Sequence, residues 1–433
     1  MNHLPSLTEN RPLRFLTISV LYFTQGIQTG LFLTAMPAYL ANQGAEASAI
    51  AGFIGVIMLP WTFKIIGAVL MDRFTFLPMG RRRPWVIAAM IGAVIGYIAM
   101  AWVEDPINHI SLLVITGLIV STSTAFMDVA VDSMTVDIVP EEEYSKANAF
   151  MMGSNAVGLA VTIAVGSWAL SRFGISFTFM GTAVFVALIS LFPILLKERD
   201  GERMFPWSEG EVSTIALELN MESWGEILRN LLKALILPAS ILLGLVSFLI
   251  GSTNGLLKAF LPVLTVQELG WLDTDFSNLV ATASLVAGIT GMTIGGFLIS
   301  WLGTIRGAIV FLVTLILAAL FMGFFPAFWE SALAVEGFIF AVNILRTLFL
   351  IALFTACMAI CWKQVAATQF TIYMAISNFG ISLGAGMYGW LASFQSSELV
   401  FFAFALIIAL MIGLLMKVNL DDHSEKVREL ERI

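Results

Sequence analysis

The sequence predicts an all-α membrane protein with twelve transmembrane helices in two six-helix bundles. Its composition, its long apolar runs and an internal repeat lead to this prediction. Of 433 residues, 59% are hydrophobic and 12% are charged, with a mean hydropathy of +0.92. Because soluble proteins carry about a quarter charged residues, no soluble domain is expected.

Long apolar runs recur along nearly the whole chain. VIAAMIGAVIGYIAMAWV (86–103) is one example. A spanning helix needs about 20 such residues, and twelve segments meet this length. We expect them at 13–42, 47–72, 84–103, 110–139, 143–171, 175–197, 232–268, 274–301, 305–325, 332–360, 364–393 and 397–417.

The basic residues set the orientation. If both termini are cytoplasmic, 18 of the 22 Lys and Arg residues face the cytoplasm, as the positive-inside rule requires. The first span is too long for a cleaved signal sequence. We therefore expect a multi-pass protein of a bacterial inner membrane. The predicted domains are an N-terminal bundle (1–197), a cytoplasmic linker (198–231), a C-terminal bundle (232–417) and a cytoplasmic tail (418–433).

The two halves carry matching segments in the same order. GLFLTAMP (30–37) matches GLLKAFLP (255–262), and ANAFMMGSNAVG (147–158) matches ATQFTIYMAISNFG (367–380). GAVLMDRF (67–74) corresponds to GGFLISWLG (295–303). Parallel six-helix repeats describe the major facilitator architecture, in which two halves rock about a site at the membrane midplane.

The loop after the second predicted span resembles the major facilitator loop signature, with FTFLPM inserted. At a helix end, a carboxylate can hold an Arg and a neighbouring helix N-terminus in one state and release them in another. The alternative is that the arginines only anchor the loop at the membrane surface. Ser300 takes the acidic position in the second half. The predicted gating residues are Gly67, Asp72, Arg73, Gly80, Arg81 and Arg82.

Three blocks resemble AmpG-type muropeptide permeases. They are PWTFKIIGAVLMDRF with GRRRPW (60–85), MDVAVDSMTVDIVPEEE (127–143) and AATQF (366–370). The resemblance implies import of an anhydromuropeptide or a related amino-sugar peptide. Siderophore importers and acetyl-CoA transporters belong to the same broad relationship and remain alternatives.

Acidic residues within the fourth predicted span need an explanation, because burying a carboxylate in hydrocarbon costs several kcal/mol unless it is paired or wetted. Asp128 and Asp132 lie one turn apart on one helix face. Lys64, at a similar depth, is predicted to pair with Asp132, leaving Asp128 freer to carry a proton. A static ion-pair network and direct substrate contact are the alternatives. Asp137 points elsewhere and is expected to pair at the helix end.

Two cations lie in spans of the second half. Arg346 and Lys258 are expected on cavity-lining helices, where they would bind an anionic solute. Snorkelling, or pairing of Arg346 with Glu336, is the alternative. Further polar residues within spans are candidates for substrate binding or for helix–helix hydrogen bonds: Gln25, Asn254 and Gln369.

Other function classes find little support. No ATP-binding G-x-x-x-x-G-K-[ST] motif occurs, and no metalloprotease or serine-hydrolase motif occurs. An intramembrane prenyltransferase remains a weak alternative, since Asp128, Asp132 and Asp137 only superficially form an Asp-rich helix. We expect no enzyme activity, no metal, no cofactor beyond a proton gradient, no nucleic-acid partner and a monomer.

Overall fold

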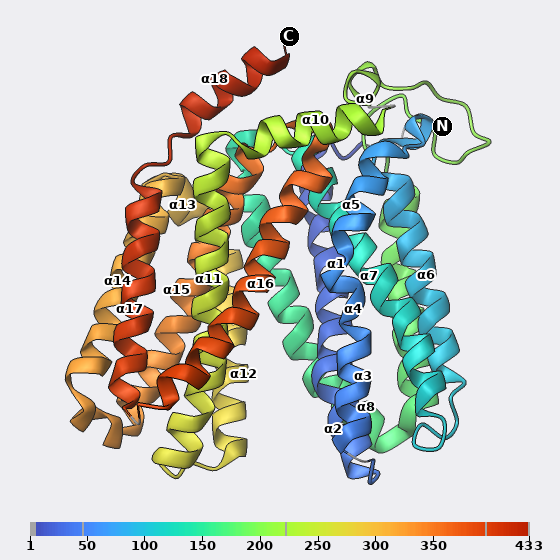
Figure 1. Cartoon of the computed structure of the whole chain (residues 1–433). Coiled ribbons are helices and arrows are strands. Elements are labelled where there is room, and N and C mark those ends of the chain that lie inside the picture. Colours follow the sequence, from blue (N-terminus) through green and yellow to red (C-terminus); the bar gives the residue numbers. More distant parts are fainter. Residues whose placement is uncertain (1–5, 46, 221–222, 395, 432–433) are drawn as a thin grey trace. The chain divides into compact units, whose positions relative to one another are not determined.

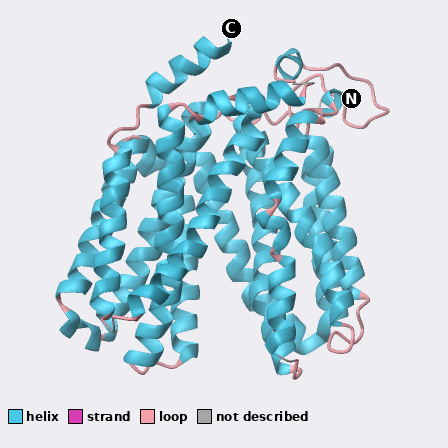
Figure 2. Ribbon diagram, viewed as in Figure 1, coloured by secondary structure: helices cyan, strands magenta, loops and turns pink. Residues whose placement is uncertain are grey.

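The computed structural model describes residues 6–45, 47–220, 223–394 and 396–431. These residues form helices joined by loops, with no strand among them (Figure 2). Eleven described helical segments are long and apolar enough to cross a membrane. One of them, α8 (Tyr144–Leu195), runs for 52 residues and is broken at Gly174, where φ is +78°. Since about 20 residues cross a bilayer, α8 supplies two spans, which gives the twelve predicted.

The chain divides into two compact units. Unit 1 comprises residues 1–140, 154–229 and 363–371, and unit 2 comprises 141–153, 230–362 and 372–433. This grouping differs from the sequence-based bounds at two short segments, 141–153 and 363–371. Each of these segments begins a long helix, so α8 and α16 (Ala366–Ala392) each start in one unit and continue in the other.

Unit 1 contains the helices of the first half, shown from blue to green in Figure 1. They are α1 (Arg11–Gly30), α2 (Met36–Asn42), α3 (Ala47–Ile57), α4 (Leu59–Thr62), α5 (Lys64–Arg73), α6 (Arg83–Ala101), α7 (Ile110–Ile138), most of α8, and α9 (Thr214–Glu218) in the linker.

The second predicted span is interrupted twice, which places Lys64 at the start of α5. Pro60 cannot continue the helical hydrogen-bond ladder, and the Trp61 amide turns to the Met58 carbonyl instead. The Ile57 carbonyl accepts a hydrogen bond of 2.5 Å from the Ser121 hydroxyl on α7. A side chain therefore satisfies backbone that would otherwise be exposed inside the bundle.

Unit 2 contains the helices of the second half. They are α11 (Pro238–Pro262), α12 (Asp273–Thr290), α13 (Gly296–Leu302), α14 (Thr304–Phe324), α15 (Ala332–Ala359), most of α16, α17 (Ser397–Leu415) and the tail helix α18 (Leu420–Glu431). Between α9 and α11 lies α10 (Trp224–Leu235), which the division between the units crosses.

Both repeat copies contain irregular helix and glycine-mediated packing. π-helical turns occupy Leu31–Ala35, just before Pro37, and Val263–Glu268, just after Pro262. A Cβ on Gly30 would lie 3.0 Å from the Leu159 carbonyl oxygen of α8, and a Cβ on its counterpart Gly255 would meet the Ile381 carbonyl of α16. The matching segments thus form the same close helix contact within each unit, as the repeat predicts.

Candidate functional site

A buried ion pair occupies the interior of unit 1. The Lys64 Nζ lies 2.9 Å from the Asp128 Oδ2, and both side chains are almost fully excluded from solvent. The Gln25 Nε2 on α1 donates a 2.9 Å hydrogen bond to the Asp128 Oδ1. Both carboxylate oxygens of Asp128 therefore have partners, which offsets much of the cost of burying this charge.

The predicted pairing of Lys64 with Asp132 is wrong. Asp132 accepts a hydrogen bond from the hydroxyl of Tyr22 instead, and its Oδ2 has no hydrogen-bond partner among the described residues. The helix break that starts α5 at Lys64 moves this side chain to the level of Asp128, and sequence spacing along an unbroken helix could not show it. Asp132, not Asp128, is the carboxylate with a spare acceptor.

Tyr22 is a site residue that sequence reasoning missed. It lies one turn before Gln25 on α1, so both side chains share the helix face that meets α7. The spacing of three residues between Tyr22 and Gln25 was the sequence signal that could have identified Tyr22. Further polar atoms on α1 have no partner in the described part of the chain, namely Gln25 Oε1 and both amide atoms of Gln28. The interior of unit 1 can therefore take up further hydrogen bonds.

The two predicted cations lie in unit 2. Lys258 on α11 is exposed, and Arg346 on α15 is half-buried. They are close enough for their positive charges to interact. The Nε of Arg346 is buried without a hydrogen-bond partner among the described residues. Glu336 does not supply one, because ten residues along α15 correspond to about 15 Å.

The other predicted binding residues are divided between the two units. Asn254 is buried on α11 of unit 2, while Gln25 is bound to Asp128 in unit 1. Gln369 is buried near the start of α16, in the segment that belongs to unit 1. Arg346, Lys258 and Asn254 thus belong to unit 2, on α11 and α15, and the two glutamines belong to unit 1.

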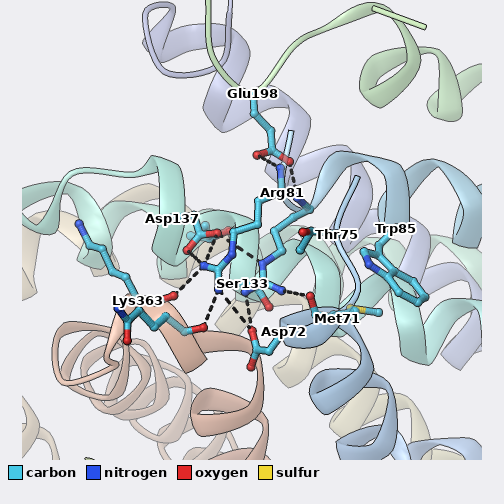
Figure 3. A network of polar contacts seen from close by, with 12 residues as sticks. Met71, Asp72, Thr75, Arg81, Trp85, Ser133, Asp137, Glu198 and Lys363 are labelled. Carbon is cyan, nitrogen blue, oxygen red and sulfur yellow. Dashed lines mark hydrogen bonds and ion pairs between the residues drawn. The ribbon is translucent and has the colours of Figure 1, made fainter. Parts of the chain in front are cut away.

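The loop after α5 forms a second polar network (Figure 3). The Asp72 Oδ1 lies 2.6 Å from Arg82, and its Oδ2 accepts hydrogen bonds from the backbone amide and hydroxyl of Thr368, at 2.9 and 2.7 Å. Thr368 is in the first turn of α16, where unpaired amides and the helix dipole favour an anion. Asp72 thus holds an Arg and a helix N-terminus at once.

Arg81 reaches the same helix start. Its guanidinium donates to the carbonyls of Lys363 and Gln364, at 2.7 and 2.6 Å, and lies 3.2 Å from Asp137. Figure 3 shows Arg81 between Asp137 and Lys363. Asp137 is a pairing residue at a helix end, as predicted.

The burial of these arginines bears on the alternative that they only anchor the loop. Arg81 and Arg82 are fully buried, so they do not simply anchor the loop among lipid headgroups. Burial and the neighbouring Arg82 lower the pKa of Arg81, against the opposing effects of Asp137 and Asp72. Burial also acts on Arg82, but Asp72 and Asp137 outweigh it and raise the pKa of Arg82.

The linker supplies a carboxylate that sequence reasoning missed. Glu198 accepts hydrogen bonds from the backbone amides of Arg81, Arg82 and Arg83, the first two at 3.0 and 2.7 Å. It therefore satisfies the unpaired amides at the start of α6. Gly80 is required beside it, since its φ is +102° and a Cβ would lie 2.7 Å from the Glu198 carboxyl carbon.

Arg83 also binds the linker, through its side chain. Its guanidinium donates to four carbonyls, of Pro193 and Ile194 at the end of α8 and of Arg203 and Met204 in the linker. The available signal was the acidic and basic run KERDGER (197–203) directly after the sixth predicted span.

The repeat counterpart of Asp72 makes a weaker contact. The Ser300 hydroxyl lies 2.9 Å from that of Ser145 near the start of α8, within unit 2. In each unit, the end of one helix therefore meets the start of a helix that continues in the other unit. Of these two contacts, the one in unit 1 is charged and the one in unit 2 joins two hydroxyls.

The comparison with known families decides the assignment. The sequence profile described as "Major Facilitator Superfamily" matches residues 18–385. The chain belongs to the Major Facilitator Superfamily. It is thus a member of a family of membrane transporters, and the prenyltransferase alternative loses its support.

Named relatives place the chain near AmpG proteins. It is 24% identical to "Putative transporter AmpG 4" of Rickettsia conorii over 428 residues, covering 94% of this chain and 96% of the relative. It is 25% identical to the "Anhydromuropeptide permease" of Escherichia coli K12 over 149 residues, which are 34% of this chain and 30% of the relative. The resemblance deduced from the sequence is confirmed.

Solved structures of the superfamily share the fold. The Escherichia coli fucose:proton symporter FucP superposes with a TM-score of 0.71 at 14% identity, covering 94% of this chain and 98% of that one. A bacterial homologue of the iron transporter ferroportin gives 0.70 at 11% identity, with 94% and 98% covered. These similarities concern the fold alone.

Proposed function

We propose that the protein is a secondary active permease that imports an anionic hydrophilic solute together with protons. The first candidate solute is an anhydromuropeptide, because a relative matched over nearly its full length is named "Putative transporter AmpG 4" and a further relative is named "Anhydromuropeptide permease". The bacterial inner membrane, cytoplasmic termini and a monomeric state belong to the same proposal.

The observation that carries proton coupling is the unequal state of the two carboxylates on α7. Asp128 is paired with Lys64, whereas Asp132 has an unpartnered oxygen among the described residues and a neighbouring negative charge one turn away. A proton on Asp132 would remove that second charge from a low-dielectric interior. In a state of the transport cycle in which water reaches Asp132, its carboxyl group could release the proton. In this proposal Asp132 alone gains and loses the coupled proton, and Asp128 stays paired with Lys64.

Solute binding is assigned to the cations of unit 2. Arg346 and Lys258 are two cations of unit 2 whose charges interact, and the buried Nε of Arg346 is a donor without a hydrogen-bond partner among the described residues. A carboxylate or phosphate group would satisfy both. An anhydromuropeptide carries peptide carboxylates, which fits this requirement.

The loop network is proposed to act as a latch. Asp72 and Arg81 bind the start of α16, which continues in unit 2. Breaking these contacts would free that helix start, and the network would then re-form when the transport cycle returns. A latch of this kind exchanges two arrangements of the same charges.

Transport in sealed vesicles tests the coupling. With the purified protein in liposomes and an inward proton gradient, the wild type should accumulate N-acetylglucosaminyl-anhydromuramyl tripeptide about tenfold per pH unit at one proton per solute. Asp132→Asn should abolish accumulation and retain exchange at equal concentrations. Undiminished gradient-driven accumulation by this variant would disprove the assignment of Asp132.

A separate experiment addresses the solute. Thermal shifts of the purified protein would be compared for anhydromuropeptides, ferric siderophores and CoA esters, which are the candidates left open by the family resemblance. We expect stabilisation by the muropeptide, weakened at least tenfold in apparent affinity by Arg346→Gln because a charge-assisted contact contributes about 1.5–3 kcal/mol. A response to siderophores or CoA esters alone would replace the solute but leave the coupling proposal standing.

A further inference from the structure

A hollow of about 690 Å³ lies in unit 1 beside the loop that follows α5. Arg73, Phe74, Phe76, Trp85 and Asn220 are among the residues that line it. α5 ends a transmembrane segment at Arg73, and α6 begins another at Arg83. The hollow is therefore at the membrane boundary, at the level of lipid headgroups.

The charge in this hollow belongs to Arg73. Its neighbour Asp72 is turned away and engaged by Arg82 and Thr368. The Arg73 Nε is buried with no hydrogen-bond partner in the described part of the chain, and its guanidinium carbon lies 5.3 Å from the centre of the Phe74 ring. Arg73 thus brings a positive charge and an unpartnered donor to the lining of the hollow.

Aromatic side chains surround this cation. Phe74 and Phe76 are 50% and 43% exposed, and the ring of Phe74 meets that of Trp224 edge-on at 5.8 Å. The Trp85 indole fixes the loop by donating a 2.7 Å hydrogen bond to the Phe74 carbonyl. Exposed aromatic residues of this kind are enriched where membrane proteins meet the headgroup region.

The helix that carries Trp224 continues this surface. α10 ends at Leu235, shortly before the membrane span α11 begins at Pro238. One face of α10 is packed against protein and contains Ile227, Leu231 and Ala234. In the part of α10 that belongs to unit 1, a second apolar stripe is about half exposed and consists of Trp224 and Leu228, four residues apart. An exposed apolar stripe on a helix that enters a span directly afterwards is typical of helices lying in the membrane interface.

We propose that this hollow binds the headgroup of an anionic phospholipid, with the phosphate on Arg73 and the acyl chains along the exposed stripe of α10. Arginine pairs with phosphate through two donors at once. The aromatic rim and the stripe favour a lipid over inorganic phosphate, because they offer apolar surface to acyl chains and no hydrogen bonds to a hydrated ion. The preference for an anionic headgroup follows from the charge of Arg73, because the described residues that line the hollow include no carboxylate.

Competition between lipids tests the proposal. Native mass spectrometry would measure binding of dioleoylphosphatidylglycerol and dioleoylphosphatidylcholine to the detergent-purified protein. We expect the wild type to prefer phosphatidylglycerol, and Arg73→Gln to reduce that preference about fivefold, since one basic residue near an anionic surface contributes about 1 kcal/mol. Arg306→Gln is the matched control, because Arg306 is exposed on α14 and does not line the hollow.

Each other outcome counts against the proposal. Equal binding of the two lipids by the wild type would overturn it without any variant, which matters if Arg73→Gln is too unstable to purify. An equal loss in Arg306→Gln would indicate a general charge effect. If sodium phosphate at the same concentration stabilises the wild type against heat as much as phosphatidylglycerol does, the site binds a free anion and not a lipid.

Discussion

The ion pair between Lys64 and Asp128 can be tested by a double-mutant cycle. The Nζ–Oδ2 distance is 2.9 Å, and both side chains are at most 2% exposed. Removing one partner of such a pair leaves an unpaired buried charge, which costs about 3–5 kcal/mol. Lys64→Gln should therefore lower the free energy of unfolding by this amount, and adding Asp128→Asn should restore most of it.

Asp132 provides the comparison that makes this cycle decisive. It accepts its hydrogen bond from Tyr22, while Lys64 pairs with Asp128, so the coupling energy between Lys64→Gln and Asp132→Asn should be smaller than that between Lys64→Gln and Asp128→Asn. The assay is chemical unfolding of the purified protein in detergent, followed by tryptophan fluorescence. A coupling to Asp132 as large as that to Asp128 would refute the pairing described above and return Asp128 to the role of free carboxylate.

Two further predictions concern the linker. Glu198→Ala removes the acceptor for three backbone amides at the start of α6 and should cost about 2–4 kcal/mol of unfolding free energy, whereas Glu209→Ala, an exposed acid in the same loop, should change it by less than about 0.5 kcal/mol. Similar losses in both would contradict the capping role. Burial and the charge of Glu198 raise the pKa of Glu202 to about 7. The folded state then binds this proton more tightly than the unfolded state does, so stability should fall as pH rises from about 4.5 to 7, by at most about 3 kcal/mol. Glu202→Gln should remove this dependence in unfolding measured at pH 5, 6 and 7, and an unchanged slope would disprove the assignment.

The candidate site could be predicted in its residue types but not in its pairings. Asp128, Asp132 and Lys64 stand out because charged side chains are rare within apolar spans. Their partners depend on where helices break and rotate. The interruption at Pro60 and Phe63 moves Lys64 relative to a continuous helix, and no residue spacing reports that displacement.

For the loop after α5, the sequence likewise predicted the residue types but not their partners. Its sequence identifies Asp72, Arg81 and Arg82 as a charged group at a helix end. It could not indicate Thr368 or Glu198, since both come from segments far away in the chain.

The sequence alone determined the membrane class, the twelve spans, the repeat and the family, because each follows from hydrophobicity, helix length and local motifs. Those properties act over one or two helical turns or along a single span. Only the tertiary structure decided which acid Lys64 neutralises, which helix start Asp72 holds, and where Arg73 points, because hydrogen bonds and ion pairs depend on distances of a few ångströms between helices that the chain brings together from remote positions.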